Sequence, residues 1–200
     1  MSDFRTLAYT KLASDTASIV FGGLDVTPYS VLEIHAELKT DRASNTWDAF
    51  TLTPSSGIGV TSGDGGTANT AVAYSSGNSY PGAIWANALG NAQNAIVGIC
   101  AGNTMSGLAD RSGMPARILV FNPVKELEST ERDITVYAES TGGYGSTIGE
   151  SAYDQDVYRT VNNWPGRTDA SITSLTFASY YSANFLTGSW VAIYGYYGGD

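Results

Sequence analysis

Short runs of alternating apolar and polar residues recur along the chain, and this period of two constrains the fold more than any other feature. In the run YSVLEIHAELK, residues 29–39, one face is apolar: Leu32, Ile34, Ala36 and Leu38. The opposite face is mostly polar: Val31, Glu33, His35 and Glu37. Because successive side chains of a β-strand point to opposite faces of a sheet, this pattern predicts a strand with one buried face.

Similar short runs occupy much of the remaining chain. They cover residues 17–22, 47–53, 94–102, 116–122, 133–139, 155–161, 171–177 and 189–196. Turn-forming stretches such as TPYS, TPSSG, SGDGG and NWPG separate them. We find no amphipathic helices of the kind that connect parallel strands, so the pattern predicts an antiparallel β-sandwich or a closed barrel.

The region 54–94 is the least regular part of the sequence, being rich in glycine, serine, threonine and asparagine and low in charge. It is either a flexible linker between two domains or a long connection across one end of a sandwich. We expect the connection, because neither side alone has enough predicted strands to close a sandwich, and residues 1–200 then form a single domain. The best helix candidate is AIWANALGNAQ, residues 83–93, and residues 140–150 are a second candidate for an exposed loop.

Acidic side chains outnumber basic ones, and the 200 residues carry a formal net charge of −9. Binding to nucleic acid or to an anionic membrane surface needs a basic cluster, and none is visible. The first residues, MSDFRTLAYTKL, lack the basic and apolar regions of a secretory signal peptide. No run reaches the roughly 18 apolar residues of a membrane span. We therefore expect a protein made in a cytoplasm, with neither nucleic acid nor membrane as its partner.

Residues that could support catalysis or metal binding are few. His35 is the single histidine, and we interpret its position between Glu33 and Glu37 as a surface polar stripe rather than a base oriented by a carboxylate. Cys100 is the single cysteine and lies in the apolar run AIVGICAG, which predicts a small buried side chain. One histidine and one cysteine cannot build a typical zinc site, and the acidic stretches SGDGG and YDQD match no calcium loop. We expect no cofactor, no metal and no enzyme activity.

Aromatic side chains are the other candidates for function. The tryptophans are the obvious probes of a surface that stacks on sugars: Trp47, Trp85, Trp164 and Trp190. Trp190 alternates with Ala192 and Tyr194, as on the face of a sheet. Trp164, in VNNWPGRTD, lies in a predicted turn and is expected to be the most exposed of the four. Packing in the core or in a subunit interface is the default for all of them, because each ring buries a large area.

The C-terminal part of the chain combines a strand with the sequence ITSL, a short break, and F-x-x-GS before a strand that contains YG. The matching residues are Ile172, Thr173, Ser174, Leu175, Phe185, Gly188, Ser189, Tyr194 and Gly195. The strand with Tyr29, Leu32 and Ile34 and the segment ARILVFNP extend the pattern. On these segments the chain resembles a family of tailed-bacteriophage virion structural proteins of the head-decoration or minor structural type.

The resemblance implies a jelly-roll-like β-sandwich with long connecting loops that assembles on the virus particle as a homo-oligomer, with a trimer favoured. It also implies assembly in the host cytoplasm, a location on the virion, and the major capsid protein or other virion proteins as partners. We expect a non-enzymatic capsid decoration or cement protein. The alternative is a tail or fibre module that binds host-surface glycans, and a hydrolase based on His35 or paired carboxylates is a third hypothesis. The residues expected at the subunit or capsid interface are Trp190, Tyr194, Tyr196, Trp85 and Trp164.

Overall fold

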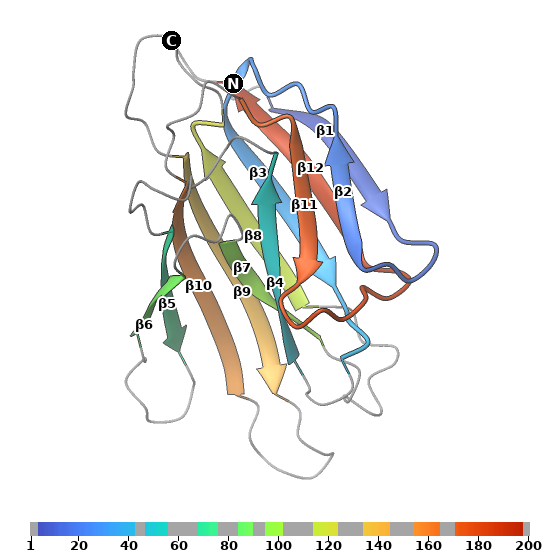
Figure 1. The fold of residues 1–200 in the computed structure, drawn as a ribbon, viewed down its shortest axis with the longest axis vertical. Helices are drawn as coiled ribbons and strands as arrows, with labels where there is room; N and C mark the ends of the chain where they lie inside the picture. Colours follow the sequence, from blue (N-terminus) through green and yellow to red (C-terminus); the bar gives the residue numbers. More distant parts are fainter. Residues whose placement is uncertain are drawn as a thin grey trace.

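Two antiparallel β-sheets packed face to face make up the described part of the molecule (Figure 1). The computed structural model describes residues 4–42, 47–55, 68–75, 84–89, 95–101, 114–123, 134–144, 154–164 and 171–197. Every regular element in these ranges is a strand, and each strand pair is antiparallel. No helix in the same ranges could cross a membrane. The predicted all-β antiparallel sandwich is confirmed.

The two sheets differ in size, with eight strands in one and four in the other. The large sheet runs in the order β1 (Phe4–Lys11), β12 (Trp190–Tyr197), β3 (Tyr29–Leu38), β8 (Met114–Phe121), β9 (Ile134–Tyr144), β10 (Asp154–Trp164), β5 (Ala68–Ser75) and β6 (Ile84–Leu89). The small sheet runs β2 (Ser18–Gly22), β11 (Ser174–Ser179), β4 (Trp47–Pro54) and β7 (Ala95–Ala101).

The strand pairing is nested along the chain. The first strand pairs with the last, β2 with β11, β3 with β8, β4 with β7, and β5 with β6. The β9–β10 hairpin lies between β8 and β5 and extends the large sheet beyond this nested set. A nested order is what results when one long antiparallel ribbon folds over and wraps around a core, so strands from both ends of the chain lie side by side.

The core lies between the sheets and is built from the alternating strand faces that the sequence predicts. All nine predicted runs coincide with strands to within a few residues. In β3 the predicted apolar face is buried, with exposures between 0% and 2%: Leu32, Ile34, Ala36 and Leu38. The largest side chains that fill the core are Trp164, Phe50, Phe177 and Phe185.

The connection from β11 to β12 contains the F-x-x-GS sequence, residues 185–189, and each of its defined positions has a structural role. Phe185 is fully buried and bridges the backbone of Thr16 and Thr40. Gly188 has φ = 87°, a conformation that favours glycine. The Ser189 hydroxyl accepts a hydrogen bond from the Lys39 backbone N–H at 3.0 Å. The buried Phe185 side chain, the left-handed backbone at Gly188 and the hydrogen bond of Ser189 therefore hold this connection in place.

Two carboxylates fix the same connection from outside. Asp15 Oδ1 accepts hydrogen bonds from the backbone N–H and the hydroxyl of Thr187 at 2.7 and 2.9 Å. Asp41 accepts from the backbone N–H and the side-chain amide of Asn184, each at 2.8 Å. The final strand is thus anchored to two earlier loops as well as to β1 and β3.

The structure corrects three expectations about the middle of the chain. The region 54–94 is not a connection throughout, because β5 and β6 lie within it and join the large sheet. The helix expected over residues 83–93 was wrong, since residues 84–89 form β6. The loop expected over residues 140–150 was wrong as far as Tyr144, where β9 ends, and its remainder lies outside the described residues.

Candidate functional site

The outer face of the large sheet carries a group of aromatic side chains over β1 and β12. Alternation in β12 leaves Trp190, Tyr194 and Tyr196 on this face, while the residues between them face the core or lie buried. The neighbouring strand β1 adds Phe4 and Tyr9, which are 60% and 59% exposed. We call these five residues the aromatic face.

The rings of the aromatic face contact one another across the two strands. Phe4 stacks on Tyr196 with centroids 5.9 Å apart, and its edge meets Tyr194 at 6.1 Å. Tyr9 lies 6.5 Å from Trp190, whose indole N–H donates to Glu37 Oε2 at 3.1 Å. Because these contacts limit ring rotation, a partner that binds here immobilises few additional rotamers.

A line of charged side chains crosses the same outer face beside the rings. Glu33 in β3 accepts hydrogen bonds from Arg117 at 2.6 Å and pairs with His35 at 2.9 Å. Further along the sheet, Arg159 lies 3.4 Å from Glu139. Burial raises the pKa of Glu33, but hydrogen bonds from Arg117, Tyr196 and His35 outweigh that effect and lower the pKa to about 2. Glu33 therefore stays ionised and orients its neighbours.

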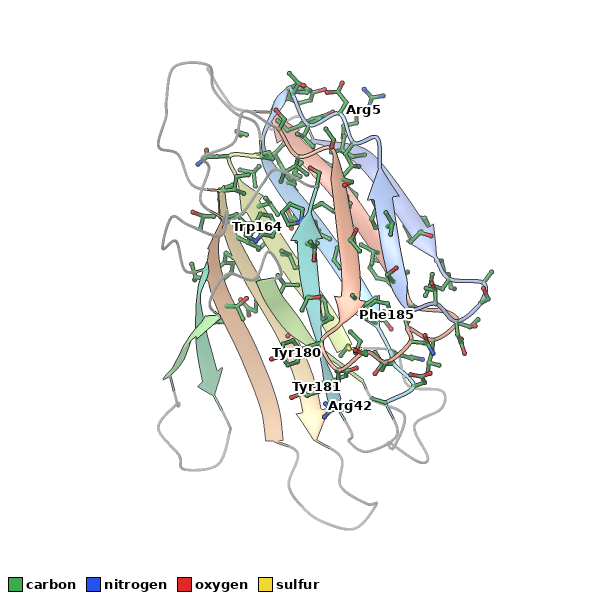
Figure 2. All side chains as sticks on the ribbon, in the orientation of Figure 1. Arg5, Arg42, Trp164, Tyr180, Tyr181 and Phe185 are labelled. Atoms are coloured by element: carbon green, nitrogen blue, oxygen red, sulfur yellow. The ribbon has the colours of Figure 1, made fainter. Side chains whose placement is uncertain are left out.

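A cleft of about 350 Å³ opens at one end of the sandwich, between the two sheet edges formed by β1 and β2. Its lining includes Arg5, Phe21, Gly22, Asp25, Tyr29 and Tyr197. The Tyr29 and Tyr197 rings lie 4.8 Å apart, and their hydroxyls are 3.5 Å apart. The cleft thus combines aromatic walls with a guanidinium and a carboxylate. Figure 2 shows Arg5 at this end.

The opposite end of the molecule carries a tyrosine turn beyond β11 (Figure 2). Tyr180 and Tyr181 are 46% and 47% exposed, and their rings meet edge to face at 5.0 Å. The Arg42 guanidinium lies 3.5 Å from the centre of the Tyr181 ring. Beneath them, the buried Asp48 accepts a hydrogen bond from the Ser179 hydroxyl at 2.7 Å. The Ser179 hydroxyl in turn accepts hydrogen bonds from the backbone N–H groups of Tyr181 and Ala183. Asp48 therefore holds the turn indirectly, through Ser179.

Three of the five residues expected at an interface come together, and two do not. Trp190, Tyr194 and Tyr196 belong to the aromatic face. Trp85 lies in β6, at the far edge of the large sheet, and its side chain is outside the description. The expectation that Trp164 is exposed in a turn was wrong, because it ends β10 and is only 1% exposed. The residue before a proline favours extended backbone, so the strand continues up to Trp164 before Pro165.

Sequence reasoning missed Phe4, Tyr9 and the cleft residue Arg5. All three lie in β1, for which the pattern predicts no strand. The signal is weak because β1 contains a bulge between Thr6 and Ala8 that interrupts the period of two. Pairing with β12 places Phe4 and Tyr9 on its outer face and Arg5 opposite Gly195, on the side of the cleft.

The structure also places the residues considered for catalysis and metal binding. His35 lies at the protein surface and pairs with Glu33 at 2.9 Å. Cys100 is fully buried, as predicted, and burial together with the nearby Asp48 charge raises the pKa of its thiol. Among the described residues, no three histidine, cysteine, aspartate or glutamate side chains are placed to hold a metal ion. Asp64 lies outside those residues, and so do the side chains of Asp154 and Asp156.

Comparisons with known proteins identify no relative of this chain. No protein-family model matches it, and no curated protein and no solved structure does so either. The class of protein therefore has to be inferred from the fold and from these surfaces.

Proposed function

We propose that this chain is a non-enzymatic bacteriophage virion structural protein that decorates or cements the capsid. The observation that carries the proposal is the aromatic face, whose rings form a contiguous group of two exposed and three half-buried side chains. Contiguous apolar surface of this kind marks a surface that contacts another protein. Aromatic residues and arginine are enriched at protein interfaces, whereas lysine is depleted. On this face Arg117 and Arg159 accompany the five rings.

We propose a jelly roll as the finer description of the fold. The nested pairing supports it: strands β1, β12, β3 and β8 form one set of four, and β2, β11, β4 and β7 form the other. The hairpins β5–β6 and β9–β10 then extend one sheet. Jelly rolls of eight strands occur in viral capsid domains, lectins and cupins, so the fold suits a virion protein without selecting that class by itself. A crystal structure in which β2 does not pair with β11 would contradict this description.

The partner that we propose for the aromatic face is the major capsid protein or a second copy of this chain. A trimer is the assembly that we favour, with the protein made in the host cytoplasm and carried on the virion. The net charge of −9 disfavours nucleic acid as a competing partner. Light scattering during size-exclusion chromatography measures the subunit number, and a monomeric mass at micromolar concentration would count against a stable homo-oligomer.

Binding to undecorated capsids is the direct test of the proposed function. Purified protein should co-sediment with the capsids at micromolar concentration, and Tyr9→Ser together with Phe4→Ser should abolish this binding. Val20→Ser is the matched control, because Val20 is 62% exposed on β2 of the other sheet. A wild-type protein that does not co-sediment, or a double variant that binds like wild type, would refute the assignment.

The alternative function is a tail or fibre module that binds host-surface glycans. The observation that favours it is the tyrosine turn, where Tyr180 and Tyr181 form an exposed aromatic pair at one end of the sandwich. Immunogold electron microscopy of the source virus separates the two functions. Label over the head supports decoration, and label on the tail, with host-cell binding that is lost in Tyr181→Ala, supports the alternative.

A further inference from the structure

The cleft between β1 and β2 has the dimensions and the chemistry of a small-molecule site. Its volume of about 350 Å³ lies within the range of roughly 300–1,000 Å³ that is typical of such sites. It is separate from the aromatic face: Arg5 is paired with Gly195, one of the core-facing positions of β12, whereas Phe4 is paired with Tyr196 on the outer face. Whatever occupies the cleft therefore does not compete for the aromatic face.

One wall of the cleft is aromatic. The Tyr197 ring is 44% exposed, while the Tyr29 ring beside it is 4% exposed and held in place by the core. Tyrosine presents an apolar ring and a polar hydroxyl, so this wall can pack against the C–H face of a ring and bond to its hydroxyl groups. A saccharide has both features.

Arg5 gives the cleft a cation, and it has no carboxylate partner among the residues that the structure describes. The other arginines that the structure describes each lie near an acid, Arg42 at Asp48, Arg117 at Glu33 and Arg159 at Glu139. Among the same described residues, Arg5 forms no ion pair, although Asp25 lines the same cleft. A guanidinium offers a planar fork of donors that matches a carboxylate, so Arg5 favours a ligand that carries one.

Asp25 restricts which anion the cleft accepts. Its Oδ1 accepts the backbone N–H of Thr27 at 3.2 Å, and Oδ2 has no partner among the described residues. A carboxylate beside the site repels a doubly charged phosphate more strongly than a singly charged carboxylate, and it accepts hydrogen bonds from sugar hydroxyls. The ligand class that satisfies Arg5, Asp25 and the tyrosine wall together is a sugar with one carboxyl group.

We propose that this cleft binds an acidic saccharide, with the carboxylate on Arg5, hydroxyls on Asp25 and the ring against Tyr197. This proposal depends on the cleft alone and is independent of where on the virus particle the protein is located. It needs no bond to be made or broken, so it is a recognition site. Glycines form part of its floor, and at Gly22 and Gly23 an added Cβ would meet nothing within 4 Å, so the space beside this backbone is open.

The test is a titration of the full chain with glucuronate and with glucose, which share a ring and differ at one carboxylate. The amide resonances of Leu7, Gly22 and Tyr197 should shift on addition of glucuronate, with an affinity roughly tenfold higher than for glucose, because charge-assisted hydrogen bonds contribute that order of discrimination. Arg5→Gln should reduce the affinity for glucuronate to that for glucose. Arg5→Lys keeps the charge without the planar fork and should give an intermediate value.

Lys11→Gln is the matched control, because it removes one positive charge from the exposed opposite end of the same strand. It should leave the glucuronate affinity unchanged. The proposal is overturned if neither sugar shifts these resonances, if the two sugars bind equally well to wild type, or if Lys11→Gln and Arg5→Gln weaken binding equally. No capsid is present in this assay, so its failure is distinguishable from failure of the proposed virion function.

Discussion

Gly195 occupies a core-facing position of β12 where the structure leaves no room for a side chain. A Cβ added there would lie 2.5 Å from Cδ1, 2.6 Å from Cγ and 2.8 Å from Cδ2 of the Tyr29 ring. Favourable carbon–carbon contacts begin at about 3.5 Å, so the ring or the strand would have to move by about 1 Å. Tyr29 is 4% exposed, and β12 is paired on both sides, so neither moves freely.

We therefore expect Gly195→Ala to destabilise the protein. Overpacking of a core typically costs about 1–3 kcal/mol, whereas replacing glycine stabilises by roughly 0.4–1 kcal/mol through the unfolded chain. The net loss is about 1–2 kcal/mol in the free energy of unfolding. For a chain of this length, that loss lowers Tm by roughly 3–6 °C, which calorimetry or circular dichroism resolves easily.

Gly22→Ala is the control for the intrinsic effect of alanine, because a Cβ at Gly22 has nothing within 4 Å and its φ is not positive. It should melt at or slightly above the wild-type temperature. Tyr29→Leu removes the opposing ring, so its combination with Gly195→Ala should be less destabilised than the sum of the single changes. If Gly195→Ala melts like wild type, or if the two changes add, the steric reasoning is wrong.

Three further predictions concern single positions. Glu33→Gln should lower the free energy of unfolding by about 1–2 kcal/mol at pH 7. This loss is smaller than the shift of the Glu33 pKa from 4.5 to about 2 would give in full, because Arg117 is 59% exposed and solvent screens the pair. A lowered carboxyl pKa stabilises the fold above pH 4.5, and that contribution is lost as the pH falls towards 2. The unfolding free energies of wild type and variant should therefore converge as the pH is lowered. A difference that stays constant with pH would contradict the lowered pKa. Asp48→Asn should lower the free energy of unfolding, measured by chemical denaturation, by about 2 kcal/mol. The reason is that a neutral amide replaces a fully buried carboxylate that lies near Arg42 and accepts a hydrogen bond from Ser179. A change below about 0.5 kcal/mol would show that the carboxylate charge is dispensable. Gly188→Ala should cost about 1 kcal/mol in the same assay, because its φ of 87° is strained for a side chain, and an unchanged midpoint would contradict that strain.

The sequence predicts those strands whose two faces meet different environments. In β3 and β12 one face lies in the core and the other outside, so apolar and polar residues alternate or aromatic rings mark the outer face. Prediction failed for three strands of the large sheet, β1, β5 and β6, whereas the edge strands of the small sheet, β2 and β7, were predicted. β1 and β6 are the edges of the large sheet, and β5 is next to β6. The sequences of β5 and β6, ANTAVAYS and IWANAL, contain no charged residue, so their period of two is weak, and in β1 the bulge interrupts it.

The candidate surfaces were only partly predictable, for a related reason. The rings at Trp190, Tyr194 and Tyr196 follow from local alternation alone. The cleft depends on Arg5, Asp25 and Tyr197, which are far apart in sequence and meet only because the first strand pairs with the last. No short sequence motif predicts that these three residues lie close together, because their proximity results from the nested pairing.

Strand β1 contributes to both proposed surfaces through two adjacent residues. Phe4 pairs with Tyr196 on the outer face, and Arg5 pairs with Gly195 on the side that faces the cleft. We therefore expect Phe4→Ser to weaken capsid binding and to leave glucuronate binding unchanged, whereas Arg5→Gln should have the opposite effect. Both residues are exposed, so neither change should lower Tm by more than about 2 °C. If either variant loses both activities while its melting temperature is retained, the two faces of β1 are not independent, and one of the two assignments is wrong.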